Sequence, residues 1–111
     1  MLRTVSGIAP GVMLGLAFLA NGSGLQAQSD ASKIFKANCT LCHSEDGSGS
    51  SATGKALKAK DLRSDEVQKN TNEGLAEVIA KGRGKMPSFG SKFSPEVVKS
   101  LVAYIRQLPK K

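Results

Sequence analysis

Two cysteines and a histidine stand together in the sequence Cys39-Thr40-Leu41-Cys42-His43. Thiols three residues apart lie about one helical turn apart, so each can reach one of the two vinyl groups on the same side of a porphyrin. The imidazole that follows points at the iron from the same face, and a neutral histidine nitrogen ligates iron well. The spacing is the attachment signature of haem c. It predicts one haem c bound through Cys39 and Cys42, with His43 as an iron ligand.

Other roles for the two cysteines are less consistent with the rest of the sequence. A thioredoxin-like redox pair needs strands in βαβ order, and no segment of this chain alternates as a strand would. A zinc site needs four ligands, whereas His43 is the only histidine and Cys39 and Cys42 are the only cysteines. A disulfide between residues three apart would close a very small loop and add little stability. The thiol and zinc interpretations remain as alternatives.

Met86 is the candidate ligand for the opposite face of the iron. It is the only methionine after residue 27 and lies in a segment rich in glycine, residues 82–90, between two predicted helices. Pro87 follows directly and limits the directions in which the thioether can point. The common alternative for a methionine is a role as a core filler. A lysine could also replace it as a ligand, although none of the twelve stands out.

The N-terminal segment has the features of a secretory signal peptide. Arg3 is the only charged residue in it, an apolar stretch covers residues 8–20, and small and polar residues follow up to Ala27. This order predicts cleavage after Ala27. The alternative is an uncleaved membrane anchor, but the stretch is shorter than the roughly 20 apolar residues of a spanning helix and contains Pro10.

Cleavage at that point divides the chain into a signal peptide at residues 1–27 and a single monohaem domain at residues 28–111. We expect the domain to be exported to the periplasm or to an equivalent extracytoplasmic space such as a thylakoid lumen. The chain has a formal net charge of +7, and the signal peptide takes one of its 16 basic residues and none of its nine acidic ones, which leaves +6.

This positive charge favours acidic partners, and we expect redox proteins with acidic docking surfaces. Nucleic acid fits poorly, because the chain is exported and contains few aromatic residues. We expect a monomer that meets membranes only through partner complexes, since a transient partner needs access to the haem edge. The basic residues that surround Met86, with no acid between Val78 and Pro95, are Lys81, Arg83, Lys85 and Lys92. We call them the basic loop group; they would either steer acidic partners or form an ordinary solvated face.

The domain is predicted to be all-α. Residues 44–54 have the composition of a loop. The last helix is the clearest, since Ser94 can cap it and Pro95 suits the first helical position. Its predicted apolar stripe consists of Val97, Leu101, Tyr104, Ile105 and Leu108. The residues that can cap the expected helices are Ser29 or Asp30, Ser64, Thr71 or Asn72, and Ser94.

The chain resembles the class I c-type cytochromes, in particular the short bacterial members related to the photosynthetic algal type. The resemblance covers nearly all of residues 30–108. It rests on the stretch around Asp61 and on the segments FKANCTLCH at 35–43, GRGKMPSF at 82–89 and VAYIRQL at 102–108. It implies a cytochrome c fold of three to five short helices around one haem, in which the first and last helices cross and bring Phe35 near Tyr104.

By this resemblance, Cys39 and Cys42 form the two thioethers, His43 is the proximal ligand and Met86 the distal one. The implied function is that of a soluble single-electron carrier, not an enzyme, between partners of a respiratory or photosynthetic chain. Histidine and methionine together raise the reduction potential, and a six-coordinate iron leaves no position for oxygen. Two other functions stay open: a haem enzyme or gas sensor in which Met86 does not bind, and a thiol oxidoreductase with free cysteines.

The sequence departs from the family pattern just before Leu62. The family usually has a proline there, whose carbonyl orients the proximal histidine, but this chain has Lys60 and Asp61. Any backbone carbonyl can accept that hydrogen bond, so the sequence leaves open which one holds His43. The residues expected to bury the haem are Ile34, Phe35, Leu62, Leu101 and Ile105.

Overall fold

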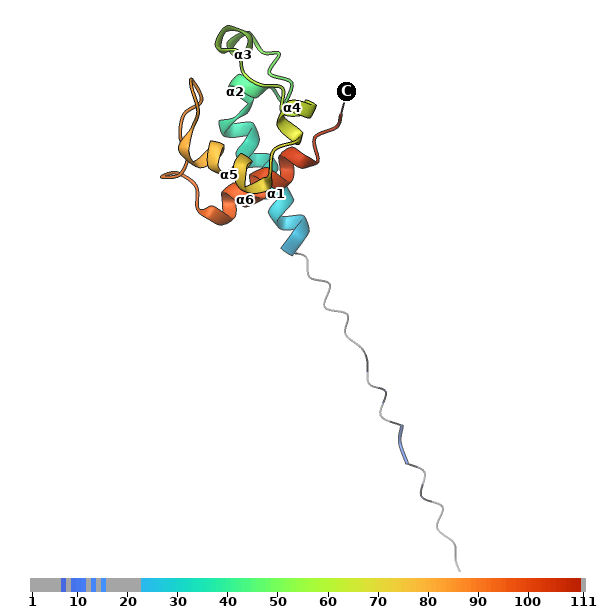
Figure 1. The fold of residues 1–111 in the computed structure, drawn as a ribbon. Helices are drawn as coiled ribbons and strands as arrows, with labels where there is room; N and C mark the ends of the chain where they lie inside the picture. Colours follow the sequence, from blue (N-terminus) through green and yellow to red (C-terminus); the bar gives the residue numbers. More distant parts are fainter. Residues whose placement is uncertain (1–6, 8, 12, 14, 16–22, 111) are drawn as a thin grey trace, which may run out of the picture.

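The computed structural model describes residues 7, 9–11, 13, 15 and 23–110, and the regular structure within them is entirely helical (Figure 1). This confirms the predicted all-α class. Two of the helices have only four residues each. In chain order the helices are α1 (Ser23–Asn38), α2 (Thr40–His43), α3 (Ala52–Leu57), α4 (Asp65–Gln68), α5 (Asn72–Lys81) and α6 (Pro95–Arg106).

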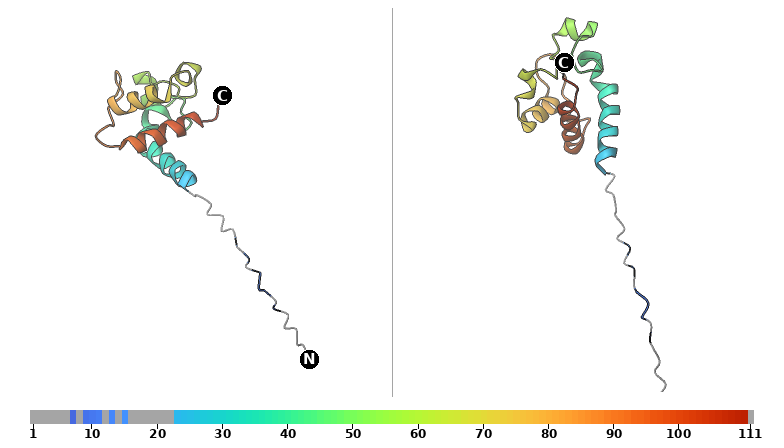
Figure 2. Two further views of the ribbon diagram at one scale, coloured as in Figure 1. Left: turned by 60° about the horizontal axis from the view of Figure 1, so that its bottom comes forward. Right: turned by 90° about the vertical axis from the view of Figure 1, so that its right-hand side faces the viewer.

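The first and last helices cross and form the centre of the domain (Figure 2). Phe35 of α1 and Leu101 of α6 are each only 1% exposed, which makes them the largest fully buried side chains among the described residues. The ring of Phe35 lies 5.0 Å from that of Tyr104, between ring centroids, at an angle of 46°. The predicted crossing of these two helices, with Phe35 near Tyr104, is therefore confirmed. Helix α5 packs against α6 and extends the core on its other side.

Three helices begin where their capping residues predict. The hydroxyls of Ser64, Thr71 and Ser94 each accept a hydrogen bond from a backbone N–H three residues later, at 3.3, 3.0 and 3.2 Å. Such caps satisfy N–H groups that have no partner within the helix. Local sequence thus fixes the starts of α4, α5 and α6.

Helix α1 begins at Ser23, and not at Ser29 or Asp30 as the capping pattern predicts. The preceding residues include alanine and glutamine, which favour helix, and Gln26 donates to the carboxylate of Asp30 one turn later at 3.2 Å. The predicted cleavage point after Ala27 therefore lies inside α1. Most of the predicted signal peptide falls outside the described residues.

Two further predictions about the elements are wrong. The predicted loop at residues 44–54 includes the start of α3, whose Ser51 hydroxyl accepts from the Gly54 N–H at 3.0 Å. The buried stripe of α6 includes Val98 and Val102, whereas Val97 and Tyr104 are only partly buried, because α6 packs between α1 and α5 and therefore buries a wider face. No helix within the described part of the chain is long and apolar enough to cross a membrane.

Candidate haem-binding site

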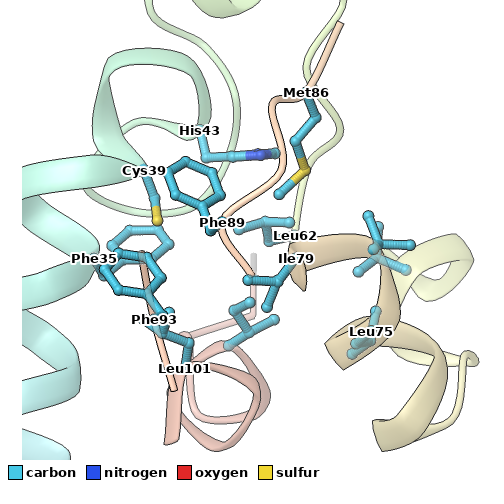
Figure 3. A pocket seen from close by; sticks show the side chains of 13 residues that line it. Phe35, Cys39, His43, Leu62, Leu75, Ile79, Met86, Phe89, Phe93 and Leu101 are labelled. Carbon is cyan, nitrogen blue, oxygen red and sulfur yellow. The ribbon is translucent and has the colours of Figure 1, made fainter. Parts of the chain in front are cut away.

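An apolar cavity lies between α1, α5, α6 and the loop that joins α5 to α6 (Figure 3). Its empty space is about 560 Å³ when the opening to solvent is included. Among its lining residues, only His43 carries a nitrogen or oxygen in its side chain. The lining residues are Phe35, Cys39, His43, Leu62, Val67, Leu75, Val78, Ile79, Met86, Phe89, Phe93, Leu101 and Ile105.

The turn that follows α1 positions the cysteines and the histidine. The N–H of Cys39 donates to the Phe35 carbonyl at 2.8 Å, and the N–H of His43 donates to the Cys39 carbonyl at 2.9 Å. The two thiols are free and partly buried. Cys39 lines the cavity directly, and Cys42 lies on the next turn outside the lining.

The imidazole of His43 is held by a backbone carbonyl. Its Nδ1 lies 3.0 Å from the carbonyl oxygen of Lys60, so Nδ1–H donates and Nε2 is left without a proton to act as a ligand. This identifies the carbonyl that the sequence leaves open. It belongs to Lys60, in the segment where the resemblance described above leads us to expect a proline.

Met86 reaches the cavity from the opposite side, on the loop between α5 and α6. The His43 imidazole and the Met86 thioether point toward one another (Figure 3). Met86 and Arg83 exchange two backbone hydrogen bonds of 2.9 and 3.1 Å. These bonds close the tight turn that presents the methionine.

The backbone at Gly82 lets this turn lie close to the end of α5. Gly82 has φ +76° and ψ 170°, a conformation that residues with a side chain rarely adopt. A Cβ atom there would lie 2.6 Å from the Met86 carbonyl oxygen. Glycine at this position is therefore required by both the backbone angle and the space.

The rest of the loop is attached to two helices. The Phe89 N–H donates to Ile79 of α5 at 3.0 Å, and the Phe89 and Phe93 rings stack with centroids 5.4 Å apart. The Lys92 ammonium donates to the Asn38 side chain, at the end of α1, at 2.6 Å. The loop thus spans the cavity and ends beside Cys39.

The electrostatics of the cysteines disfavour thiol chemistry. Burial and, to a smaller extent, the nearby Cys42 together raise the pKa of the Cys39 thiol to about 11. A redox-active pair needs a thiolate, and its attacking cysteine has a lowered pKa. The described residues also contain no strand that could build a thioredoxin-like sheet. Within them, no group of three or more His, Cys, Asp and Glu side chains is placed to hold a metal ion.

The cavity fits a haem. Its walls are carbon-rich, as the porphyrin face requires, and one thiol, one imidazole and one thioether face the same space. These are the groups that attach haem c and ligate its iron. The residues most readily assigned from sequence, Cys39, His43 and Met86, thus lie together.

Sequence reasoning found only part of the lining. Phe35, Leu62, Leu101 and Ile105 line the cavity as expected, whereas Ile34 packs against the core without reaching it. The sequence pattern does not single out six further lining residues, which are Val67, Leu75, Val78, Ile79, Phe89 and Phe93. Their positions on the inner faces of α4 and α5 and on the loop between α5 and α6 could have suggested them, but burial against a cofactor and burial in a core have the same sequence pattern.

Comparison with known proteins assigns the family. Residues 26–105 match the family described as cytochrome C oxidase, cbb3-type, subunit III. Cytochrome c6 of Microcystis aeruginosa is 34% identical over 76 residues, which cover 68% of this chain and 90% of that protein. Cytochrome c6 of Leptolyngbya boryana is 33% identical over 73 residues, which cover 66% of this chain and 82% of that protein.

A larger relative and a solved structure agree with this assignment. The chain is 31% identical to the cbb3-type cytochrome c oxidase subunit FixP of Azorhizobium caulinodans, and the match covers 96% of this chain but only 32% of FixP. The solved KustC0563 c-type cytochrome superposes with a TM-score of 0.66 and 34% identity, over 73% of this chain and 98% of that one. The chain belongs to the monohaem c-type cytochromes related to cytochrome c6 and to the cbb3-type subunit III family, and it is an electron carrier, not an enzyme.

Proposed function

We propose that the chain is an exported single-electron carrier with one haem c, bound through Cys39 and Cys42 and ligated by His43 and Met86. The observation that carries the proposal is that Cys39, His43 and Met86 face one apolar cavity, in a chain that belongs to the c-type cytochromes. The haem supplies the one-electron chemistry when it is bound. A carrier whose axial ligands both stay in place needs little rearrangement when it gains or loses the electron.

The residues of the chain tune this chemistry in two ways. The Lys60 carbonyl holds the His43 ring in the tautomer that presents Nε2 to the cavity and makes the imidazole a stronger donor. The apolar walls exclude water, and a low dielectric disfavours the additional positive charge of the ferric state. Methionine ligation acts in the same direction as the apolar walls and raises the potential.

Partners and location follow from the charge and from the relatives. The basic loop group lies around Met86, which supports docking by redox proteins with acidic surfaces. The resemblance to cytochrome c6 and the leader-like residues 1–27 support export to a periplasm or lumen. The chain spans 32% of FixP, so we do not extend the role of an oxidase subunit to it.

The visible spectrum of the reduced, exported protein tests the proposal. We expect the spectrum of a c-type haem, unchanged by carbon monoxide, because both axial positions are filled. The mass of the denatured protein should exceed that of the polypeptide from residue 28 by one haem. A spectrum that shifts with carbon monoxide would contradict ligation by Met86. A mass without haem would contradict covalent attachment.

A further inference from the structure

The carbonyl that holds His43 lies in a segment without regular structure, residues 58–64 between α3 and α4. Lys60 is not a proline, so no ring restricts its φ angle. A rotation of the peptide unit that joins Lys60 to Asp61 would turn the carbonyl away from the imidazole. Its orientation must therefore be fixed by contacts of the neighbouring residues.

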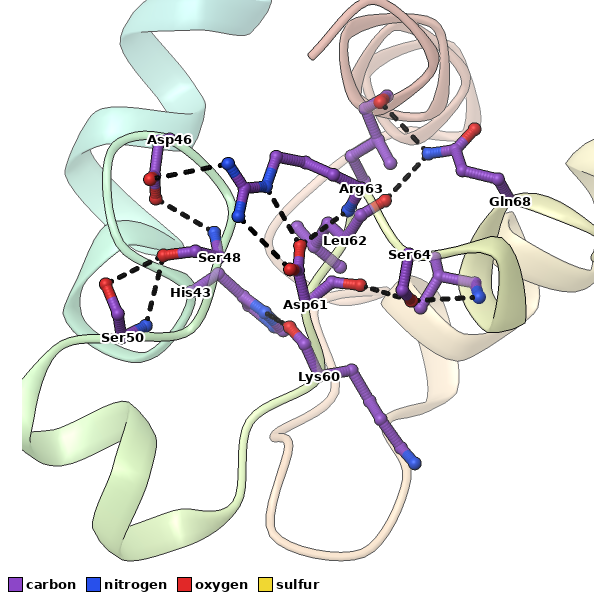
Figure 4. A network of polar contacts seen from close by, with 12 residues as sticks. His43, Asp46, Ser48, Ser50, Lys60, Asp61, Leu62, Arg63, Ser64 and Gln68 are labelled. Atoms are coloured by element: carbon purple, nitrogen blue, oxygen red, sulfur yellow. Dashed lines mark hydrogen bonds and ion pairs between the residues drawn. The ribbon is translucent and has the colours of Figure 1, made fainter. Parts of the chain in front are cut away.

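The side chain of Arg63 makes the strongest such contacts (Figure 4). Its Nε and Nη2 donate to the two carboxylate oxygens of Asp61, at 3.1 and 3.2 Å, and the Arg63 N–H donates to the same carboxylate at 2.9 Å. The Arg63 side chain is 12% exposed and that of Asp61 34%. A bidentate pair that is mostly shielded from water is stronger and better defined than an ordinary surface ion pair.

The same guanidinium joins this segment to the loop that follows His43. Its Nη1 lies 3.7 Å from the carboxylate of Asp46, and that carboxylate also accepts from the Ser48 N–H at 2.9 Å. The bonds from Ser48 and the attraction of Arg63 hold the pKa of Asp46 below its usual value. Arg63 therefore bridges the segment that holds the His43 ring and the loop that follows His43.

Backbone contacts limit how far these segments can separate. The Leu62 N–H donates to the Gly47 carbonyl at 2.8 Å, and the Gly49 N–H donates to the His43 carbonyl at 2.8 Å. A Cβ atom on Gly49 would lie 2.8 Å from the Ala59 carbonyl oxygen, so the two segments are in close contact. The Lys60–Asp61 peptide plane is then set from Asp61. Arg63 holds its carboxylate, and its carbonyl accepts from the N–H and the hydroxyl of Ser64 at 3.1 and 2.7 Å.

We propose that Arg63 is a positioning residue for the haem ligand, which orients the Lys60 carbonyl toward His43 by fixing Asp61 and the 44–50 loop. This inference rests on the proposed ligation by His43. Because a peptide unit is planar, holding Asp61 on its C-terminal side restricts the direction of the Lys60 carbonyl. Arg63 thus does with a side chain what a ring-restricted residue would do through its backbone.

The test is the variant Arg63→Lys in the ferrous holoprotein. Lysine retains the positive charge and loses the planar fork that binds both carboxylate oxygens. We expect the His43 Nδ1 proton to exchange with solvent roughly fivefold faster in the NMR spectrum, as for the loss of about one net hydrogen bond. We also expect a higher reduction potential, since a weaker bond at Nδ1 makes the imidazole a poorer donor.

Two further variants make the result decisive. Arg106→Lys is the same chemical change at an arginine whose guanidinium donates to the Asn72 side chain and to the Gln68 carbonyl, at 3.0 and 2.7 Å, and it should leave the exchange rate and the potential unchanged. Asp61→Asn replaces one of the two acceptor oxygens that the fork needs with an NH2 group, which can only donate, so it should increase the exchange rate as Arg63→Lys does. It decides the question by exchange alone if Arg63→Lys does not yield holoprotein.

The outcomes separate this inference from the proposed function. If the wild type shows no ring-current-shifted His43 signals, ligation by His43 fails and the inference fails with it. If the wild type shows them and the exchange rate stays at the wild-type value in Arg63→Lys, or in Asp61→Asn where that is the variant obtained, only the positioning role is overturned. A lower melting temperature with unchanged exchange and potential would also overturn it, because Arg63 would then only stabilise the fold.

Discussion

The two walls of the cavity are built in different ways. The proximal wall, residues 39–43 with Lys60, is a single helical turn in which the backbone bonds of Cys39 and His43 fix the side chains, and Lys60 then orients the imidazole. The distal loop, residues 82–94, presents Met86 on a tight turn and reaches its place through contacts with α5 and with Asn38. The turn at residues 39–43 is local in the sequence and takes only the Lys60 carbonyl from a distant segment, whereas the distal loop depends on packing against two helices.

This difference indicates how each wall should respond to change. A helical turn keeps its geometry as long as its own backbone bonds form. A loop keeps its geometry only while its hinges and its contacts with other helices all hold, and such segments have the lowest local stability. We therefore expect changes in the proximal wall to affect whether haem is attached. Changes in the distal loop should affect whether the axial position on the Met86 side is occupied.

The largest effect is expected from removing both attachment sites. The variant Cys39→Ala with Cys42→Ala should contain no covalent haem, because no thiol is left to form a thioether. Mass spectrometry of the denatured protein should find the polypeptide alone. Leu41→Ala changes a residue of the same turn that is 71% exposed, and it should retain the haem mass. Haem retained after denaturation of the double variant would contradict attachment at these cysteines.

The next effect is expected from opening the distal position. Met86→Ala should leave the haem attached and the fold intact, but the iron should bind carbon monoxide and the reduction potential should fall. The control Val78→Ala shortens another residue that lines the cavity and should remain inert to carbon monoxide. If Met86→Ala also fails to bind carbon monoxide, a residue other than Met86 occupies that axial position.

The same contrast explains what the sequence could predict. The turn at residues 39–43 and the helix caps at Ser64, Thr71 and Ser94 could be predicted. Each depends only on residues within about one helical turn of each other, so the local sequence is enough to specify it. The Lys60 carbonyl could not be assigned from the sequence, because every residue has a backbone carbonyl and the residue type does not show which one accepts the bond from His43. The distal phenylalanine at position 89 was equally hidden, since nothing local distinguishes a cofactor contact from a core contact.

The start of α1 was missed for a physical reason of its own. Ser29 and Asp30 are good capping residues, but a cap residue can also continue a helix when the preceding residues favour one. Here the helix extends upstream to Ser23. The sequence predicts only the sulfur and nitrogen groups of the cavity, which belong to Cys39, His43 and Met86. Its apolar walls could not be predicted, because they form only when α1 and α6 cross.

A smaller effect is expected at Gly82, which we call the hinge of the distal loop because the chain leaves α5 there. Gly82→Ala would force a side chain into an angle pair that is almost restricted to glycine and into contact with the Met86 carbonyl, at a cost of about 1–3 kcal/mol in the free energy of unfolding. Gly84→Ala is the matched control, since Gly84 also has a positive φ, +56°, but open space around it. It should cost about 1 kcal/mol. Denaturant unfolding measures both.

The hinge variant also distinguishes the two walls. Gly82→Ala should make the holoprotein more reactive toward carbon monoxide while the covalent haem content stays complete, because only the distal loop is disturbed. Equal unfolding free energies and equal reactivity in the two glycine variants would show that the hinge does not position Met86.

The smallest effect is expected at the surface of the distal loop, where charge acts on the rate of encounter and not on the site itself. The Lys81 ammonium already forms an ion pair with the Glu77 carboxylate at 3.0 Å, so it is less available to a partner. The double variant Arg83→Glu with Lys85→Glu therefore tests the surface better, since both residues are exposed. With an acidic redox partner, we expect the association rate to fall roughly tenfold at low ionic strength and the difference to shrink as salt screens the charges. Lys33→Glu with Lys99→Glu makes the same change in net charge at exposed positions on α1 and α6. A smaller loss in that control would place the docking surface at the distal loop, whereas equal losses would show that only the net charge of the protein matters.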